Sequence, residues 1–139
     1  MPDVFSKKKR SEIMSRIKSK NTKPEMVLRS FLHRMGFRFR LHSAKLLGKP
    51  DLSFPKYRVA VFVNGCFWHG HGRCRKSALP TSNREFWKTK IEKNKMRDQK
   101  AYRKLKRMGW RVIVVWECRL MKDTAVTAEK VALKIRGEV

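Results

Sequence analysis

The sequence predicts a single α/β domain whose sheet is flanked by helices. Two apolar runs, 57–63 and 110–116, have the composition of β-strands. Between them, residues 84–108 carry apolar side chains at helical spacing, and further helical patterns lie on either side. With 139 residues and no repeat, linker or break in composition, the chain is expected to form one domain, 1–139, around one hydrophobic core.

The N-terminal part combines a basic segment with a helix. Residues 1–20 mix lysines and arginines with a few apolar side chains, which is typical of a basic arm or a short amphipathic helix. Thr22-Lys23-Pro24-Glu25 fits a capping box with proline in the first turn, and Gly36 supplies a stop signal. We therefore expect a helix between Thr22 and Gly36.

The middle of the chain is expected to contribute three strands. Residues 37–41 alternate apolar and basic side chains, as a half-buried strand does. Residues 51–54 and 57–63 are separated by a turn at Pro55-Lys56, and together they predict a hairpin.

The C-terminal half predicts a long helix, a strand and a terminal helix. Asn83 can cap the helix over 84–108, and Gly109 ends it. The strand over 110–116 is almost continuously apolar, which is typical of a strand covered on both faces, and a helix over about 124–135 could cover one of them. The order of elements is that of an α/β layer structure.

The charge indicates a polyanionic partner. Lysine and arginine number 36 against 11 aspartate and glutamate, which gives a net charge of +25 and a pI near 10.9. DNA, ribosomal RNA or an anionic membrane surface would satisfy this charge. The sequence contains no apolar stretch of membrane-spanning length and no signal-peptide pattern, so a cytoplasmic protein that does not span a membrane is expected.

Four side chains predict a structural zinc site. Cys66, His71 and Cys74 lie in one loop, and Cys118 follows a strand that could run beside 57–63. Three thiolates and one imidazole are a common tetrahedral zinc set, and this assignment uses every cysteine in the chain. Alternatively, Cys118 is a buried apolar thiol. His69 could replace His71 on the metal, or it could be a free imidazole that activates water.

Two carboxylates are candidates for a magnesium site. Asp51 follows Gly48-Lys49-Pro50 at the start of a strand, where it could bind Mg²⁺ against a phosphate or simply cap a turn. Glu25 could take part as well, or it could serve only as the last residue of the capping box. Asn94 and Asp98 interrupt the apolar stripe of the long helix, and they are interpreted as a satisfied buried pair that could bond backbone near the site.

Aromatic side chains beside the same loop could wedge between base pairs. Phe67 and Trp68 lie in a polar, glycine-rich loop that is a poor place to bury them, whereas Trp87 could equally belong to the core. Basic neighbours, including Arg73 and Arg84, would grip the nucleic-acid backbone, and Met14 could act as a second wedge.

Together these motifs resemble the very-short-patch repair (Vsr) endonucleases over about residues 5–120. The matching segments are 8–35, Gly48-Lys49-Pro50-Asp51, 61–69, His71 to Cys74, 85–98 and 109–118. The resemblance implies a restriction-endonuclease-like α/β core, with a mixed central sheet flanked by helices, a structural zinc site and a DNA-contacting arm over residues 1–20.

The resemblance also implies a role for each matching residue. Asp51 would bind catalytic Mg²⁺ with help from the main-chain carbonyl of Val63, and His69 would be the general base. Glu25 would orient His69 and the metal-bound waters. Zinc would be held by Cys66, His71, Cys74 and Cys118, and DNA would be contacted by Phe67, Trp68, Trp87, Met14, Asn64, Arg73 and Arg84.

Finally, the resemblance implies a reaction and its partners. One phosphodiester of double-stranded DNA would be hydrolysed 5′ to the thymine of a T·G mismatch, which arises when 5-methylcytosine deaminates. A cytosine-5 methyltransferase, a repair polymerase and a ligase would act in the same bacterial cell, with the protein nucleoid-associated when bound to DNA. A monomer is expected, because one nick needs one active site. The alternatives are a related nuclease for another DNA site or lesion, and a non-catalytic zinc-containing nucleic-acid binder.

One departure from related nucleases concerns the strand after Asp51. Many restriction-type nucleases carry Glu-x-Lys there, whereas this chain has Phe62-Val63-Asn64. Asn64 occupies a position where members of the family can carry histidine.

Overall fold

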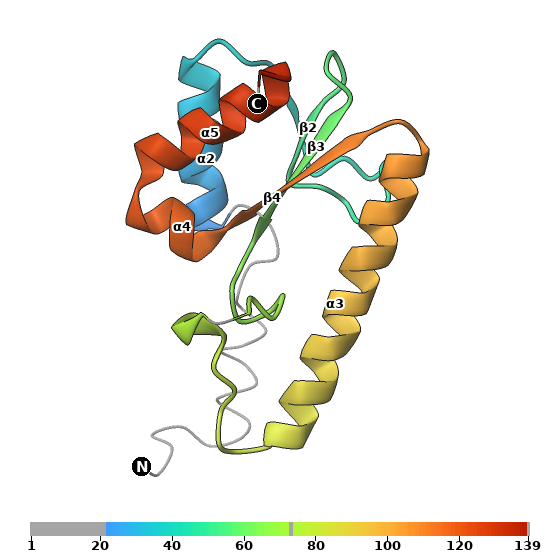
Figure 1. Cartoon of the computed structure of the whole chain (residues 1–139), viewed down its shortest axis with the longest axis vertical. Helices are drawn as coiled ribbons and strands as arrows, with labels where there is room; N and C mark the ends of the chain where they lie inside the picture. The colour runs from blue at the N-terminus through green and yellow to red at the C-terminus, as the bar shows by residue number, and fades with distance from the viewer. Residues whose placement is uncertain (1–21, 73, 139) are drawn as a thin grey trace.

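The computed structural model describes residues 22–72 and 74–138, which form a four-stranded sheet with helices on both faces (Figure 1). In chain order the elements are α2 (Lys23–Arg34), β1 (Arg40–Leu41), β2 (Leu52–Phe54), β3 (Val59–Asn64), the 3-10 helix η1 (Arg75–Ser77), α3 (Arg84–Arg107), β4 (Arg111–Trp116), α4 (Glu117–Lys122) and α5 (Thr124–Arg136). The predicted α/β class is confirmed. The expected arm over residues 1–20, with Met14, and the expected DNA contact Arg73 lie outside the described residues.

The sheet is mixed, in the order β1-β2-β3-β4. The predicted hairpin is confirmed, because β2 and β3 pair antiparallel, and β1 pairs antiparallel with β2. β3 and β4 run parallel, with cross-strand partners from Val59 and Arg111 to Asn64 and Trp116. Since parallel strands end at the same edge of a sheet, the segments that follow β3 and β4 start side by side.

The first strand is shorter than the alternating pattern predicted. Only Arg40 and Leu41 pair with β2, because Phe37 completes the end of α2 instead. Gly36 has a φ of +94°, and the Phe37 N–H donates to the Leu32 carbonyl across the helix end, as in a Schellman motif. The buried Phe37 ring packs edge-on against Phe54, with centroids 5.8 Å apart.

Each face of the sheet has its own apolar cluster. On one face α2, α4 and α5 contribute Leu28, Leu32, Leu120, Ala128, Val131, Ala132 and Ile135. On the other face α3 covers Ala60 and Phe62 with Tyr102 and Leu105. Residues of β4 contact both clusters, so the prediction of a strand covered on both faces is confirmed. The short helix α4 was not predicted.

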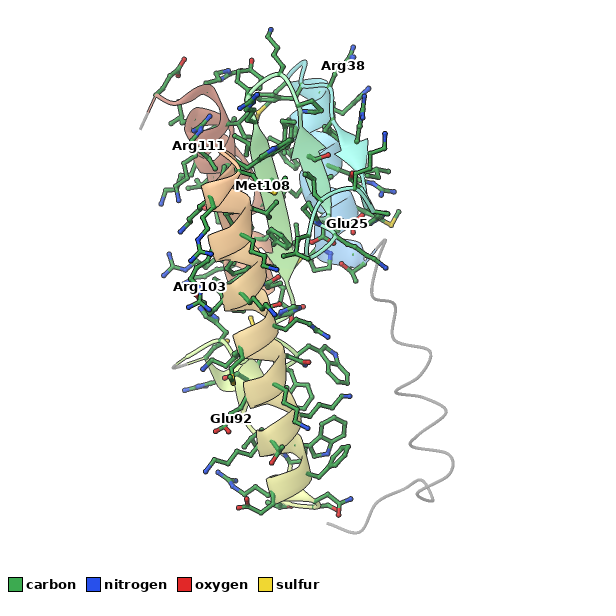
Figure 2. All side chains as sticks on the ribbon, turned by 90° about the vertical axis from the view of Figure 1, so that its right-hand side faces the viewer. Glu25, Arg38, Glu92, Arg103, Met108 and Arg111 are labelled. Carbon is green, nitrogen blue, oxygen red and sulfur yellow. The ribbon has the colours of Figure 1, made fainter. Side chains whose placement is uncertain are left out.

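Helix α3 is longer than the sheet that it covers. Figure 2 shows Met108 beside the strands and Glu92 beyond their end. In that outer half, α3 packs against the segment that follows β3: a Cβ added at Gly70, which has a φ of +60°, would lie 2.8 Å from Cγ2 of Ile91. The helix therefore supports a stretch of chain that has almost no secondary structure of its own.

Among the described residues, no helix combines the length and the apolar character needed to cross a membrane.

We expect Gly48→Ala to lower the free energy of unfolding by about 2 to 4 kcal/mol, because the added methyl group meets packed neighbours. Gly48 lies in the loop before β2, and its Cβ would stand 2.9 Å from Cβ of Ala101 and 3.3 Å from the Phe62 ring. Gly36→Ala is the matched control, since its φ is also positive but no described atom outside its chain neighbours lies within 4 Å of the new Cβ. We expect a loss of about 1 to 2 kcal/mol there. If urea denaturation shows the same loss of unfolding free energy for Gly48→Ala and Gly36→Ala, the close packing of the Gly48 loop is contradicted.

Candidate active site and metal centre

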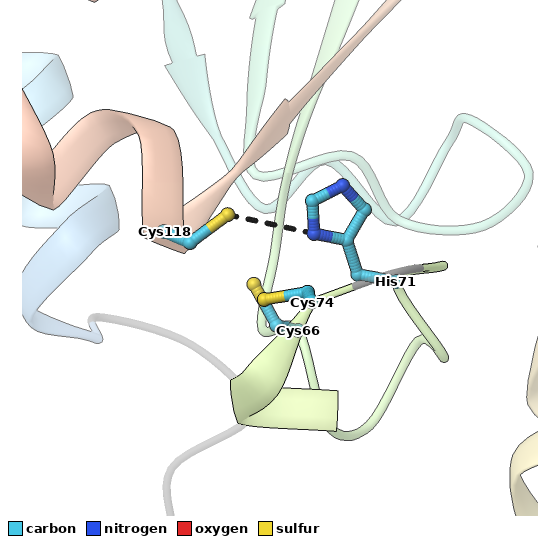
Figure 3. Close-up of side chains that lie close together, drawn as sticks. All are labelled: Cys66, His71, Cys74 and Cys118. Atoms are coloured by element: carbon cyan, nitrogen blue, oxygen red, sulfur yellow. Dashed lines mark hydrogen bonds between the residues drawn. The ribbon is translucent and has the colours of Figure 1, made fainter. Parts of the chain in front are cut away.

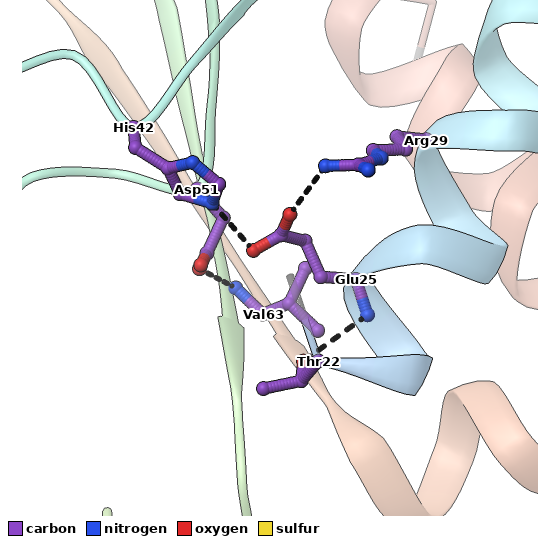
Figure 4. Close-up of polar contacts among 6 residues, drawn as sticks. All are labelled: Thr22, Glu25, Arg29, His42, Asp51 and Val63. Carbon is purple, nitrogen blue, oxygen red and sulfur yellow. Dashed lines mark hydrogen bonds and ion pairs between the residues drawn. The ribbon is translucent and has the colours of Figure 1, made fainter. Parts of the chain in front are cut away.

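Glu25 is a completely buried carboxylate at the start of α2. Thr22 caps the helix as predicted, because its Oγ1 accepts a hydrogen bond of 3.4 Å from the Glu25 N–H. The Glu25 carboxylate faces the sheet, where Oε2 accepts from Arg29 at 2.9 Å and Oε1 lies 2.8 Å from Nε2 of His42 (Figure 4). Glu25 is therefore part of a polar cluster as well as of a helix cap.

Asp51 lies beside Glu25 at the start of β2. Its Oδ2 accepts a hydrogen bond of 2.7 Å from the Val63 N–H, which joins the start of β2 to the end of β3 (Figure 4). Burial, and to a smaller extent the neighbouring Glu25, raise the pKa of Asp51 to about 7, against the lowering effect of the Val63 hydrogen bond. Two close carboxylates at a partly buried place favour a bound cation, which would offset their repulsion.

The sequence reasoning missed His42. It follows β1 directly, and the pairing of Leu41 with Leu52 sets it opposite Asp51, so that its N–H donates to the Asp51 carbonyl at 3.1 Å. One potential ligand atom each from Glu25, His42 and Asp51 lies within 4.8 Å of the others. The only sequence signal was the position of a histidine just after a strand that pairs with the Asp51 strand.

His69 is held by α3. Its Nδ1 lies 2.5 Å from Oδ2 of Asp98, and Asn94 donates to the Trp68 carbonyl at 3.0 Å. Asn94 and Asp98 thus bond the loop next to the site, rather than each other as a closed pair. The carboxylate bonded to His69 is that of Asp98, whereas Glu25 is bonded to Arg29 and His42.

The four predicted zinc ligands converge (Figure 3). Ligand atoms of Cys66, His71, Cys74 and Cys118 all lie within 4.8 Å of one another, and Nδ1 of His71 is 3.4 Å from Sγ of Cys118. Thiolate and imidazole ligands at the usual zinc distances span about 3 to 4 Å, so the donor set and its spacing fit a tetrahedral ion. His71, and not His69, is the histidine of this group.

The surroundings of the cluster orient its ligands. The His71 ring stacks on Trp116 at 4.2 Å, and the Cys66 N–H donates to the Glu117 carboxylate at 3.2 Å. Cys118 is only partly buried and opens α4, so it is not a closed apolar core thiol. Burial raises the pKa of the Cys66 thiol to about 12, and a metal ion would therefore have to displace a proton there.

Three of the predicted wedge residues form one aromatic group. Phe67, Trp68 and Trp87 contact each other edge to face, with ring centroids 5.2 to 5.8 Å apart. All three are partly exposed, so Trp87 belongs to this group and not to the core. Phe86, which is 60% exposed, packs on Trp87, and Arg84 is exposed at the start of α3.

Asn64, for which a DNA contact is expected, has a buried side chain in this structure. Its side chain is 3% exposed and donates to the Tyr102 hydroxyl at 3.0 Å. Burial raises the pKa of Tyr102 to about 12, so this hydroxyl stays protonated at neutral pH. In this conformation Asn64 ties β3 to α3.

Comparison with known proteins identifies a consistent set of relatives. Residues 2–76 match the family model for the DNA mismatch endonuclease Vsr. The type II nicking enzyme V.XorIIP of Xanthomonas oryzae pv. oryzae is 51% identical over 92% of this chain and 93% of its own length. The type II nicking enzyme V.NmeAIP of Neisseria meningitidis is 46% identical over 98% and 96%. The DNA mismatch endonuclease Vsr of Escherichia coli K12 is 41% identical over 93% and 82%.

We expect Asp51→Asn to raise the free energy of unfolding at pH 8 by about 1 to 3 kcal/mol in zinc-loaded protein without added Mg²⁺. Between pH 3.8 and about 7 the folded protein keeps a proton on Asp51 that the unfolded chain has lost. Stability therefore falls as pH rises through this window, and at pH 8 the native chain carries the whole cost of ionising Asp51.

The control is Glu129→Gln, which removes a charge from an exposed position on α5 and should change stability by less than about 0.5 kcal/mol. Urea unfolding at pH 8 and pH 6 measures both variants, and the gain from Asp51→Asn should be larger at pH 8. If Asp51→Asn gains no more stability than the control at pH 8, ionisation of Asp51 does not destabilise the metal-free fold.

Proposed function

Because the chain belongs to the Vsr family of DNA mismatch endonucleases, we propose that it nicks one strand of duplex DNA 5′ to the thymine of a T·G mismatch. The observation that carries the proposal is that a pair of carboxylates and an imidazole both lie where the chain leaves β3. The carboxylates of Asp51 and Glu25 gather at the end of β3, and the imidazole of His69 follows in the loop that leaves this strand.

Asp51 and Glu25 would hold a divalent cation, proposed to be Mg²⁺, with the main-chain carbonyl of Val63 as a further ligand. The donors fit such an ion, since hard oxygen ligands dominate and the close carboxylates repel each other without it. A bound Mg²⁺ would offset the negative charge that develops on the phosphate under attack. Glu25 is held on both carboxylate oxygens and would present a fixed acceptor to water at the ion.

His69 would be the general base. The Asp98 carboxylate would accept a hydrogen bond from Nδ1, so this nitrogen would carry the ring proton and Nε2 would be left to accept a proton from water. Asp98 acts here as a positioning residue, because it sets the tautomer and the ring orientation without reaching the substrate.

Phe67, Trp68 and Trp87 would form the wedge beside the mismatch. Their rings already support each other, and edge-to-face packing keeps them ordered while partly exposed. Phe67, Trp68 and His69 belong to the segment that the cysteine and histidine cluster joins to α4, so a zinc ion there would fix all three, whereas Trp87 is held by α3. Arg84 would contact the phosphate backbone near the wedge, as would Arg73, and Met14 would act as a second wedge; Met14 and Arg73 lie outside the described residues.

The proposed partners follow from the proposed substrate. T·G mismatches arise when 5-methylcytosine is deaminated, so a cytosine-5 methyltransferase would produce the base from which the proposed substrate forms. A polymerase and a ligase would complete the repair. One active site per nick is consistent with action as a monomer. The second candidate is a nicking enzyme of the same family that recognises another DNA site or lesion, because two of the relatives above are named type II nicking enzymes.

We expect a Mg²⁺-dependent nick on the thymine strand of a duplex with one T·G mismatch, and no cut in matched T·A or C·G duplexes. An end-labelled duplex panel with varied flanking bases measures the position of the cut. His69→Ala and Asp51→Ala should slow nicking at least about 100-fold but retain mismatch binding.

His33→Ala is the matched control, since this histidine is exposed on the far half of α2, and it should cut at the native rate. Nicking of a different lesion in the panel would favour the second candidate function. Near-native nicking by either active-site variant would remove that residue from the proposed mechanism.

The cysteine cluster is expected to hold about one zinc ion per chain. Cys118→Ser should lose more than about half of the bound zinc and lower the melting temperature by at least about 10 °C, because one of four ligands is replaced by a poor one. Elemental analysis and thermal unfolding measure the two effects. Ala78→Ser, an exposed change in the same loop, should alter neither. Full zinc content in Cys118→Ser would contradict the assignment.

A further inference from the structure

We propose that His42 is a nitrogen ligand of the cation site that it forms with Glu25 and Asp51, and that the site therefore binds Mn²⁺ more tightly than Mg²⁺. The inference rests on the proposed function, because it requires a cation at Asp51. It adds a third side chain to the two carboxylates, and it concerns the identity of the ion that the site selects.

The position of His42 is fixed by backbone as well as by its side chain. Its φ is +47°, and its N–H donates to the Asp51 carbonyl at 3.1 Å, so the residue turns out of β1 directly opposite Asp51. The side chain is 20% exposed, and its Nε2 faces the buried Glu25 carboxylate. A partly buried imidazole that is locked to the backbone of a ligand residue is well placed to act as a ligand itself.

The spacing of the three groups suits one ion. Neighbouring ligands of an octahedral ion, each about 2.1 Å from it, lie about 3 Å apart, and opposite ligands lie about 4.2 Å apart. Nε2 of His42 is 2.8 Å from Oε1 of Glu25, and the ligand atoms of all three residues fall within 4.8 Å of each other. An ion could therefore take both atoms as ligands, in place of the hydrogen bond between His42 and Glu25, with little movement of either side chain.

Orientation of Glu25 alone is a weaker explanation for His42. Arg29, one helical turn further along α2, already bonds the other oxygen of this carboxylate at 2.9 Å. Asp51 accepts from a neutral backbone N–H of Val63 and lies beside the buried Glu25, so the two carboxylates together still favour an added positive charge. A cation that touches all three residues supplies this charge where it is needed.

A nitrogen ligand changes which ion is preferred. Mg²⁺ favours oxygen ligands and gives up its water reluctantly, whereas first-row transition ions accept imidazole readily. Of these ions, Mn²⁺ is the most similar to Mg²⁺ in its preference for oxygen ligands, and it can also be followed by spectroscopy. We expect the site to bind Mn²⁺ at least about tenfold more tightly than Mg²⁺.

The test uses the full chain loaded with zinc, so that the cysteine cluster is filled before Mn²⁺ is added. Free Mn²⁺ is followed by electron paramagnetic resonance during titration, and Mg²⁺ is added in competition. His42→Gln keeps an N–H donor for Glu25 but removes the imidazole, and we expect at least about tenfold weaker Mn²⁺ binding. His33→Gln, on the exposed side of α2, is the matched control and should bind as the native chain does.

A spin-echo measurement on bound Mn²⁺ keeps the test independent of any folding defect in a variant. Coupling to an imidazole ¹⁴N should be present in the native chain and in His69→Ala, and it should vanish in His42→Gln. Asp51-dependent Mn²⁺ binding without this coupling, or with unchanged affinity in His42→Gln, overturns the role of His42 and leaves the proposed function standing. If Asp51→Ala binds Mn²⁺ as tightly as the native chain, the cation site of the proposed function itself is wrong.

Discussion

The parallel pairing of β3 with β4 is the constraint on which both sites depend. Its register ends with Asn64 beside Trp116, so the two chains leave the sheet at the same edge and at the same level. Cys66 and Cys118 each stand two residues beyond that last pair, Cys66 in a turn and Cys118 in the first turn of α4, and their thiols lie close together. On the neighbouring side of β3, Val63 presents its N–H to Asp51. One strand pairing thus places a metal clip and a carboxylate site a few residues apart.

The segment that follows β3 consists of hydrogen-bonded turns and one short 3-10 helix, and contacts with other elements fix its position. The cysteine and histidine cluster ties it to α4, while Asn94 and Asp98 tie Trp68 and His69 to α3. Close packing of Gly70 on Ile91 leaves no room for a side chain between loop and helix. This explains why α3 extends beyond the sheet: its outer half serves as the support for a loop that carries an imidazole and two aromatic rings.

The sequence was most informative where chemistry and local pattern coincide. Three cysteines and a histidine with metal-ligand spacing needed only one strand pairing to become a site, and the structure groups all four. The pairing of His69 with Asp98 depends instead on the phase of a helix relative to a loop 29 residues away, which no local pattern encodes. His42 escaped notice because β1 is only two residues long, and its role appears only once the register with β2 is known. The strand predicted from Phe37 failed for a related reason, since its backbone N–H already closes the end of α2.

The same molecule must attract phosphates and yet keep carboxylates at the point of attack. A net charge of +25 draws a polyanion toward the whole surface, but Asp51 and the buried Glu25 create a local patch of opposite sign. Arg29 offsets the charge of Glu25 and His42 bonds to it, whereas Asp51 accepts from the backbone N–H of Val63 and its burial raises its pKa to about 7. A phosphate that approaches Asp51 and Glu25 without a cation would meet the carboxyl groups alone, and one that approaches with a cation would complete its ligand shell. A bound cation would therefore remove the repulsion between these groups and the phosphate, and ion binding and substrate binding would favour each other.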